Sequence, residues 1–529
     1  MESAKPNVNE MLPVAVHVGF AGIRAIDSEN GHLQQLCNKQ FEAVFKKITE
    51  TLADRRPLFC GISQIAKGAD TLFTEFCRAQ GYLQKIYLPQ SLSFFLQATG
   101  SSGPDLSDKE KTRAKELSRS EHIIQIQTVS SSDDRHTRFE ETNFEILKSS
   151  DVIICLINEP AKEGRKGGTY ELLERAKNHK TPLFVIRYDA ESKSFCTEIE
   201  EYNLEKLCPF RLPDQLSKPI PQDKQQSVET LEGFVTVSKE ITSEKAGTEK
   251  KKYENSVAVI TWTHVIATSL AVITVFLSSV FENDLPLWLA IVLLVVELML
   301  LITGFRYHNK FHHSKVTQTW AINRLISEIN RSIVNVKIAH IDISYLRKIS
   351  FSDNLIPLLN TLDVLYLKDL KGSPVEDCES IRKTYVDNRL SGSKGQLTYY
   401  QSNLEKESAK QDTYTILFKT FSILAMVAIL IKIVIKYYHL EDHFVALMTA
   451  IIVIFPVVAV AVMSINISKD LEERQSTFRE NIDYLTNIKT LLENANTITE
   501  CQYLILKAEQ KMLSEVVSWF NRMYYRKVA

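Results

Sequence analysis

Four long apolar stretches in the second half of this chain constrain its fold more than any other feature of the sequence. Each has close to the ~20 residues that an α-helix needs to cross the hydrocarbon core of a bilayer. They run from about residue 257 to 281, 285 to 305, 413 to 437 and 444 to 467. The first half is polar overall and has only short apolar runs. We therefore predict a four-pass membrane protein with a water-soluble N-terminal part.

Charged residues beside these stretches predict their orientation. Three lysines at 250–252 precede the first stretch, and Arg306 follows the second, whereas the turn at 282–284 carries no positive charge. Basic residues favour the cytoplasmic side of a membrane. We expect a plasma-membrane protein with both termini in the cytoplasm. In the third stretch, Lys419 and Lys432 must then face protein or reach the interface.

The region from about residue 12 to 187 alternates short apolar runs with helical patterns. We predict helices near 33–52, 69–80 and 169–178. The apolar runs predict strands near 14–20, 57–63, 85–89, 122–127, 151–157 and 182–188. Continuous apolar strands that alternate with helices are typical of a parallel sheet covered on both faces. The expected fold class is α/β: a Rossmann-like parallel sheet domain, followed by an all-α transmembrane and cytoplasmic helical region.

These patterns divide the chain into six segments. We expect a nucleotide-binding domain at 1–207, a linker and pre-membrane helix at 208–252, a first transmembrane hairpin at 253–306, a cytoplasmic helical region at 307–412, a second hairpin at 413–467 and C-terminal cytoplasmic helices at 468–529. The helices after each hairpin carry an apolar seam with helical spacing, which must be buried. Packing into a helical bundle, either within the chain or between subunits, would bury it. We expect the protein to form a homo-oligomer.

Three polar loops follow predicted strands of the N-terminal domain. The candidate ligand-binding residues in them are Gly19, Gly22 and Arg24 in the first loop, Ser63, Gly68 and Asp70 in the second, and Arg165, Gly167, Gly168, Thr169 and Glu171 in the third. Glycines let a ligand approach the backbone, and helix N-termini offer free N–H groups to a phosphate. All three loops fall at the carboxyl ends of strands, where open α/β sheets bind ligands.

Each of these loops also has a plainer interpretation. The first could be an ordinary tight turn. Asp70 could be the N-cap of the helix that follows it. The convergence of all three loops at one edge of the sheet is what favours a site.

Composition argues against two other kinds of site. The net charge is −1, whereas binding to nucleic acid polymers usually demands a strongly basic face. The eight cysteines are scattered, with no close pair at zinc-ligand spacing, so we expect no metal site. The same cysteines fit a reducing cytosol.

The loop residues carry a resemblance to a known family. Gly22 with Arg24, the segment 63–70, and the Gly-Gly-Thr at 167–169 with Glu171 resemble the SLOG superfamily over roughly residues 12 to 190. That superfamily includes the lonely-guy nucleotide hydrolases and nucleotide sensors of bacterial defence systems. The related bacterial pattern has His at Ile23 and Glu at Lys67, and these departures affect catalysis more than binding.

The membrane half is similar to SLATT domains, which often accompany SLOG domains. The matching residues are Arg389, Gln396, Tyr399 and Tyr400, within about 384–529. Together the two resemblances imply an anti-phage defence effector. Its soluble domain would sense a nucleotide second messenger, such as a cyclic oligonucleotide or an ADP-ribose derivative, without a cofactor. Its membrane part would permeabilise the bilayer.

Polar residues inside the apolar stretches are candidates for a pore. Glu297 lies in the middle of the second stretch, where a carboxylate is costly unless it faces a pore or a partner. Thr274 and Ser278 share one helical face with Ala267 and Ala271 in the first stretch. Small and hydroxylated faces mediate close helix packing, and they can also line a pore.

Two alternatives to a ligand-gated effector remain at this stage. One is a membrane-tethered nucleotide hydrolase in which Glu171 is the acid–base carboxylate. We find no second carboxylate or nucleophile that would pair with Glu171 in catalysis. Apart from Glu171 we therefore predict no catalytic residue, and we favour nucleotide sensing over hydrolysis. The other is a membrane scaffold with an empty Rossmann-like domain.

Overall fold

The computed structural model describes residues 12–525, except 53–54, 98–105, 160–166, 197, 208–227, 282–285, 349–354, 394, 439–441 and 469. The chain forms two compact units, and each is built from two separate stretches of sequence. The sheet unit comprises Met1–Ser238 and Asp342–Pro374. The helical unit comprises Lys239–Ile341 and Val375–Ala529. The chain therefore passes between the units three times.

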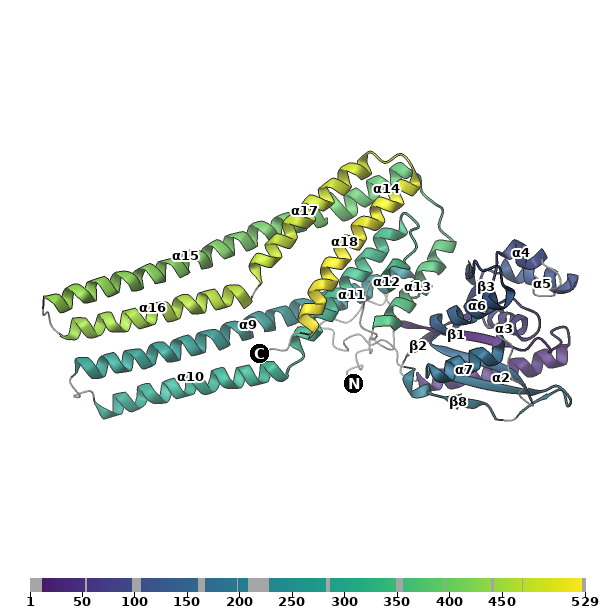
Figure 1. Cartoon of the computed structure of the whole chain (residues 1–529), viewed down its shortest axis with the longest axis horizontal. Coiled ribbons are helices and arrows are strands. Elements are labelled where there is room, and N and C mark those ends of the chain that lie inside the picture. Colours follow the sequence, from purple (N-terminus) through teal and green to yellow (C-terminus); the bar gives the residue numbers. More distant parts are fainter. Residues whose placement is uncertain are drawn as a thin grey trace, which may run out of the picture. The chain divides into compact units, whose positions relative to one another are not determined.

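Among the described residues, the sheet unit contains a mixed, mainly parallel sheet of eight strands (Figure 1). The sequence predicted the parallel sheet and its first six strands, but not β7 and β8. Its strands are β1 (Pro13–Gly22), β2 (Arg56–Ser63), β3 (Leu83–Leu88), β4 (Ile123–Thr128), β5 (Val152–Glu159), β6 (Leu183–Asp189), β7 (Ser194–Phe195) and β8 (Glu200–Tyr202). The order is β4-β3-β2-β1-β5-β6-β7, and β8 also pairs with β6. The pairs among β1 to β6 are parallel, whereas β7 and β8 run antiparallel to β6.

Helices cover both faces of this sheet. One face packs on α2 (Gly31–Thr51) and α3 (Ala69–Ala79), and Phe20 of β1 stacks on Phe73 at a centroid distance of 4.5 Å. The other face packs on α6 (Arg135–Ser149) and α7 (Thr169–Asn178). The short helices α4 (Leu92–Gln97) and α5 (Asp108–Ser118) pack beside β3 and β4. Alternate residues of β1 thus enter different cores, as a parallel strand buried on both faces requires.

A helix from the middle of the chain completes the sheet unit. Helix α13 (Ile356–Lys371) lies in the sequence between the second and third apolar stretches, where we expected a separate cytoplasmic region. Its Val364 packs with Ala15, Cys60 and Leu83 near the amino ends of the strands. Without α13, the apolar strand residues that it covers would be exposed to water. The segment 342–374 is therefore part of the sheet unit.

Buried charges fasten α13 to the sheet. Lys85 of β3 is 2% exposed and forms an ion pair with Asp363 of α13. The Thr361 hydroxyl accepts a hydrogen bond from the Ala15 N–H at 3.0 Å, and Asn360 donates to Asp151 at 3.0 Å. Burial alone would lower the pKa of Lys85, but the Asp363 carboxylate outweighs it and the pKa is raised. A charged lysine inside a parallel sheet is therefore stable only while α13 is docked.

In the part of the chain that the structure describes, the helical unit has four helices long and apolar enough to cross a membrane (Figure 1). They are α9 (Leu231–Val280), which begins in the sheet unit, α10 (Leu287–His313), α15 (Gln396–Tyr437) and α16 (Asp442–Ser468). In the most apolar segment of each helix, between 6% and 22% of the residues are buried within the chain. The apolar side chains therefore face outwards, as lipid or further copies of the chain would require.

Within these helices, the predicted polar positions have ordinary surroundings. The Thr274 hydroxyl donates to the Leu270 carbonyl of its own helix at 2.9 Å, and Ser278 is half-buried. Glu297 is also half-buried and makes no ion pair or hydrogen bond with any residue that the structure describes. A Cβ at Gly304 would meet the Thr263 hydroxyl at 2.7 Å, so α9 and α10 pack closely there.

The remaining helices of this unit are amphipathic and pack on one another. They are α11 (Val316–Lys337), α14 (Cys378–Tyr385), the π-helix η4 (Val386–Ser391), α17 (Leu471–Glu493) and α18 (Ile498–Tyr525). Arg389 of η4 makes two hydrogen bonds to Glu509 of α18, at 2.8 and 2.9 Å. Both side chains are at most 2% exposed. The apolar seams predicted after each hairpin are therefore buried within the chain.

Candidate functional site

The candidate site lies where the strand order of the sheet reverses. From β1 the chain proceeds to β2, β3 and β4 on one side, whereas β5 and β6 lie on the other side of β1. Open α/β sheets bind ligands at this switch point, beyond the carboxyl ends of the strands. The first and third candidate loops follow β1 and β5, the two strands that meet there.

Gly22, the last residue of β1, joins the three loops. Its N–H donates to the Asp70 carboxylate at 3.2 Å, and its carbonyl accepts from the Thr169 hydroxyl at 3.0 Å. The Ala69 N–H donates to the Ile23 carbonyl at 3.1 Å. The predicted convergence of the loops is thus present for their described residues.

Gly68 makes this close approach possible. Its φ is +88°, and a Cβ would lie 2.7 Å from the Ile23 carbonyl oxygen. Both the left-handed backbone and the missing side chain are therefore required there. Gly68 shapes the junction between the first and second loops.

Two helices that begin at this edge lack a side-chain cap. The N-caps of α3 and α7 are Gly68 and Gly168, and neither supplies a side-chain hydrogen bond. In contrast, α2, α5 and α6 are capped by Asn30, Ser107 and Asp134. A glycine N-cap supplies no side-chain acceptor to the first-turn N–H groups, which carry the positive end of the helix dipole. In α3 the Ala69 N–H already binds the Ile23 carbonyl, so the N–H groups that follow it are the ones left for a ligand. The edge between α3 and α7 is therefore suited to an anionic group.

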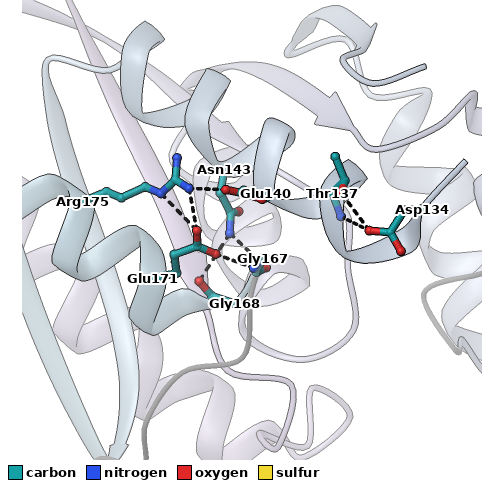
Figure 2. Close-up of polar contacts among 8 residues, drawn as sticks. All are labelled: Asp134, Thr137, Glu140, Asn143, Gly167, Gly168, Glu171 and Arg175. Atoms are coloured by element: carbon teal, nitrogen blue, oxygen red, sulfur yellow. Dashed lines mark hydrogen bonds and ion pairs between the residues drawn. The ribbon is translucent and has the colours of Figure 1, made fainter. Parts of the chain in front are cut away.

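Glu171 is occupied by contacts within the protein (Figure 2). Its carboxylate accepts the Gly167 N–H and also binds Arg175, whose Nε lies 3.1 Å from Oε1. Arg175 in turn pairs with Glu140 of α6. Both carboxylate oxygens are thus engaged, and Glu171 helps to hold the third loop.

A polar relay that the sequence did not suggest supports the same loop. Gln64 donates to the Asn143 side-chain oxygen at 3.3 Å. Asn143 in turn donates to the carbonyls of Gly167 and Gly168 at 3.0 and 3.4 Å (Figure 2). Gln64 is 6% exposed, and its Oε1 has no partner among the described residues. Its signal in the sequence is an amide directly after an apolar strand, where a buried polar group needs partners.

Asp70 does not fit its plainer interpretation, in which it is the N-cap of α3. The N-cap is Gly68, and Asp70 lies in the first turn, 7% exposed, with its carboxylate on the Gly22 N–H. Burial raises the pKa of Asp70 to about 7, although the Gly22 hydrogen bond and Arg24 oppose the shift. The charge at this edge therefore changes near neutral pH.

Of the other predicted residues that the structure describes, one lies at the surface of the domain and two lie inside it. Arg24 is exposed, and its guanidinium lies over the Phe139 ring of α6 at 5.3 Å. Gly19 and Ser63 lie inside the domain: a Cβ at Gly19 would collide with Ser150, and the Ser63 hydroxyl contacts Thr74 at 3.2 Å. These two support packing.

The basic part of the third loop, with Arg165, lies outside the described residues. Comparisons of the chain with models of known families, with curated proteins and with solved structures found no match.

Proposed function

We propose that this chain is a membrane effector. Its sheet unit would bind a nucleotide-derived messenger at the edge between α3 and α7, and its apolar helices would then permeabilise the membrane. The observation that carries the proposal is the pair of helix N-termini with glycine caps beside Gly22, at the switch point of the sheet. Phosphate groups bind at such positions through backbone N–H groups and the helix dipole.

The composition of the two units supports a four-pass topology. The sheet unit contains residues from before α9 and after α10, so both ends of the first hairpin must lie on one side of a bilayer. Arg389 and Glu509, which flank the second hairpin, form a buried pair and require the same of that hairpin. The flanking basic residues favour the cytoplasm for this side.

Helix α13 supplies a physical connection between binding and the membrane. It is part of the sheet unit, yet the chain enters it from α11 and leaves it towards α14, both in the helical unit. A change in the sheet that shifts α13 would therefore act on the segments that follow α10 and precede α15. Such a two-state element, biased by a ligand, is what coupling between distant sites requires.

The resemblance to SLOG and SLATT domains supports a role in abortive-infection defence against phage, in the inner membrane. On this proposal the ligand is a cyclic oligonucleotide or an ADP-ribose derivative. The contacts of Glu171 disfavour the alternative of a nucleotide hydrolase. A Glu171→Gln variant that still permeabilises vesicles would support sensing over hydrolysis.

Dye-loaded vesicles that contain the full-length protein test the proposal. Cyclic oligoadenylates, cyclic dinucleotides and ADP-ribose would be added in turn, and we expect one of them to release the dye. Gly168→Phe should abolish release, because it places a bulky side chain at the edge that would bind the ligand. The backbone of Gly168 is extended (φ −97°), so it accepts a side chain without strain. Gly372→Phe is the matched control, since Gly372 has φ −99° and open space around it at the end of α13. Vesicles that stay tight under every nucleotide would refute the proposal.

A further inference from the structure

Two adjoining cavities lie in the helical unit, close to the ends of the apolar stretches. One has a volume of about 370 Å³ and the other about 260 Å³, and they share Arg324, Arg474, Trp519 and Arg522 in their linings. We call them together the basal pocket. Helices α9, α11, α15, α17 and α18 all contribute to it, so its shape depends on every membrane-flanking segment.

Positive charge exceeds negative charge in the smaller cavity. Its lining has five basic side chains, among them Lys250, Lys410 and Arg324, against the acidic Glu254, Glu407 and Asp470. Burial, opposed by Glu254 and reinforced by Arg474 and Arg324, lowers the pKa of Lys250. Cations are thus crowded together at this point, and a bound anion would relieve their repulsion.

Several donors in the basal pocket have no acceptor. Arg324 stacks on Trp519, with its guanidinium carbon 4.3 Å from the ring centroid, and lies 3.6 Å from Glu515. Its N–H groups donate no hydrogen bond to any residue within the described ranges, and neither does the ammonium of Lys250 or Lys410. In the larger cavity, Asn481 is 1% exposed and its Nδ2 has no described partner. Asn481 is the buried donor of this set, whereas Lys250 is half-buried and Lys410 is exposed. A buried donor without an acceptor is costly, and it indicates a ligand that supplies acceptors.

The acidic side chains of the larger cavity do not compete for these donors. Glu473 pairs with Arg522, Glu480 with Lys511, and Glu515 with Arg324 and the Tyr400 hydroxyl. In the smaller cavity, Glu407 pairs with Arg474. Glu254 lies 3.9 Å from Lys250, too far for a hydrogen bond, and Lys410 forms no ion pair with any residue that the structure describes.

We infer that the basal pocket binds a phosphate group, and that this phosphate belongs to the headgroup of an acidic phospholipid. Lys250 and Lys410 lie within about two helical turns of Val257 and Thr413, where two of the apolar stretches begin. That depth is the headgroup layer, and basic pockets between membrane helices on the cytoplasmic side bind anionic headgroups. Trp519 and Trp320 in the lining fit the same layer, which favours tryptophan.

This inference rests on the membrane insertion of the proposed function, but not on nucleotide binding. Lipid binding to the full chain in neutral detergent can be measured by native mass spectrometry, with phosphatidylglycerol and phosphatidylcholine as competing probes. We expect phosphatidylglycerol to be retained preferentially. No nucleotide and no vesicle is present, so a failure here leaves the sensing proposal untouched.

The double variant Lys250→Gln/Lys410→Gln removes two basic charges of the basal pocket without breaking a described hydrogen bond. Each basic residue near a bilayer surface contributes enough that losing two should weaken phosphatidylglycerol binding about 30-fold. The matched control is Lys251→Gln/Lys406→Gln, on the same two helices with the same change in charge but outside the pocket. Circular dichroism melting would show that both variants are folded.

Three results would overturn the inference. Phosphatidylcholine could be retained as well as phosphatidylglycerol, or both double variants could bind lipid alike. Alternatively, inorganic phosphate or glycerol 3-phosphate at millimolar concentration could displace the lipid completely, which would assign the basal pocket to a soluble phosphate instead. Resistance to both soluble anions, with selective loss in Lys250→Gln/Lys410→Gln, would establish the lipid site.

Discussion

The two units of this molecule differ in where they place their apolar and charged side chains. The sheet unit buries its continuous apolar strands beneath helices on both faces. The helical unit exposes apolar side chains along its spans and buries an ion pair between Arg389 and Glu509. Each unit nevertheless uses a buried pair to join segments far apart in sequence. The difference in how deeply those pairs are buried predicts which unit is more sensitive to losing one.

Loss of Arg389 should have the largest effect. Arg389→Met leaves Glu509, with 0% exposure, charged and without its guanidinium partner, and should cost about 3–5 kcal/mol of stability. All four tryptophans lie in the helical unit, so their fluorescence during urea unfolding in detergent reports on this unit alone. Arg479→Met is the control on an exposed arginine of α17, and it should change stability by less than about 0.5 kcal/mol. Equal stability of the two variants would contradict the assigned role of the pair.

Loss of Lys85 should rank second. Lys85→Met leaves Asp363 without its ion-pair partner, but Asp363 is 18% exposed, so the cost should be about 3 kcal/mol. Hydrogen exchange of β1 amides by mass spectrometry would measure it in the sheet unit. Replacing both partners, as Lys85→Met/Asp363→Leu, should recover most of the loss. If the double variant is less stable than the single one, the pair does not hold α13 in the way described.

The glycine at the junction of the first two loops should rank third. Gly68→Ala adds backbone strain and a collision with Ile23 and Arg24, which together should cost about 2–3 kcal/mol. Gly81→Ala has the same strain, at φ +72°, but nothing within 4 Å, and should cost about 1 kcal/mol. The same exchange measurement compares them. Equal losses of stability in the two variants would mean that the close contacts around Gly68 do not affect stability.

Taken per unit of pH, the smallest effect should be the change in stability that follows the titration of Asp70. The folded pKa of about 7 lies above the ordinary value of 3.8, so the folded state holds this proton more tightly than the unfolded chain. Its contribution to stability is present in full below pH ~4 and is lost as the pH rises through 7, at up to ~1.4 kcal/mol per unit. Asp70→Asn should flatten this dependence between pH 5 and 8. An unchanged pH profile of sheet-unit stability would show that Asp70 is not the titrating group.

Sequence patterns were sufficient for features that depend on local order. The apolar runs predicted strands β1 to β6 and all four apolar helices, because continuous or periodic burial leaves a direct mark on the sequence. The convergence of the loops after β1, β2 and β5 followed from the parallel sheet alone. Gly22 and Thr169 meet as this geometry requires.

Features that depend on distant partners could not be predicted in the same way. Asp363 lies 278 residues from Lys85, and its helix has an ordinary apolar pattern that does not reveal which surface it covers. The signal that remained was Lys85 itself, because a lysine inside an apolar strand needs a partner from elsewhere. Glu171 illustrates the reverse case: its place at a helix start suggested chemistry, but Gly167 and Arg175 occupy it.

The central claim is that the edge between α3 and α7 binds the phosphate of a nucleotide, and titration calorimetry tests it directly. The full-length protein in detergent would be titrated with cyclic oligoadenylates, cyclic dinucleotides and ADP-ribose. We predict that one of these binds with one site per chain, that Gly168→Phe abolishes binding, and that Gly372→Phe preserves it. Binding of none of them, or equal binding by Gly168→Phe, would contradict the claim.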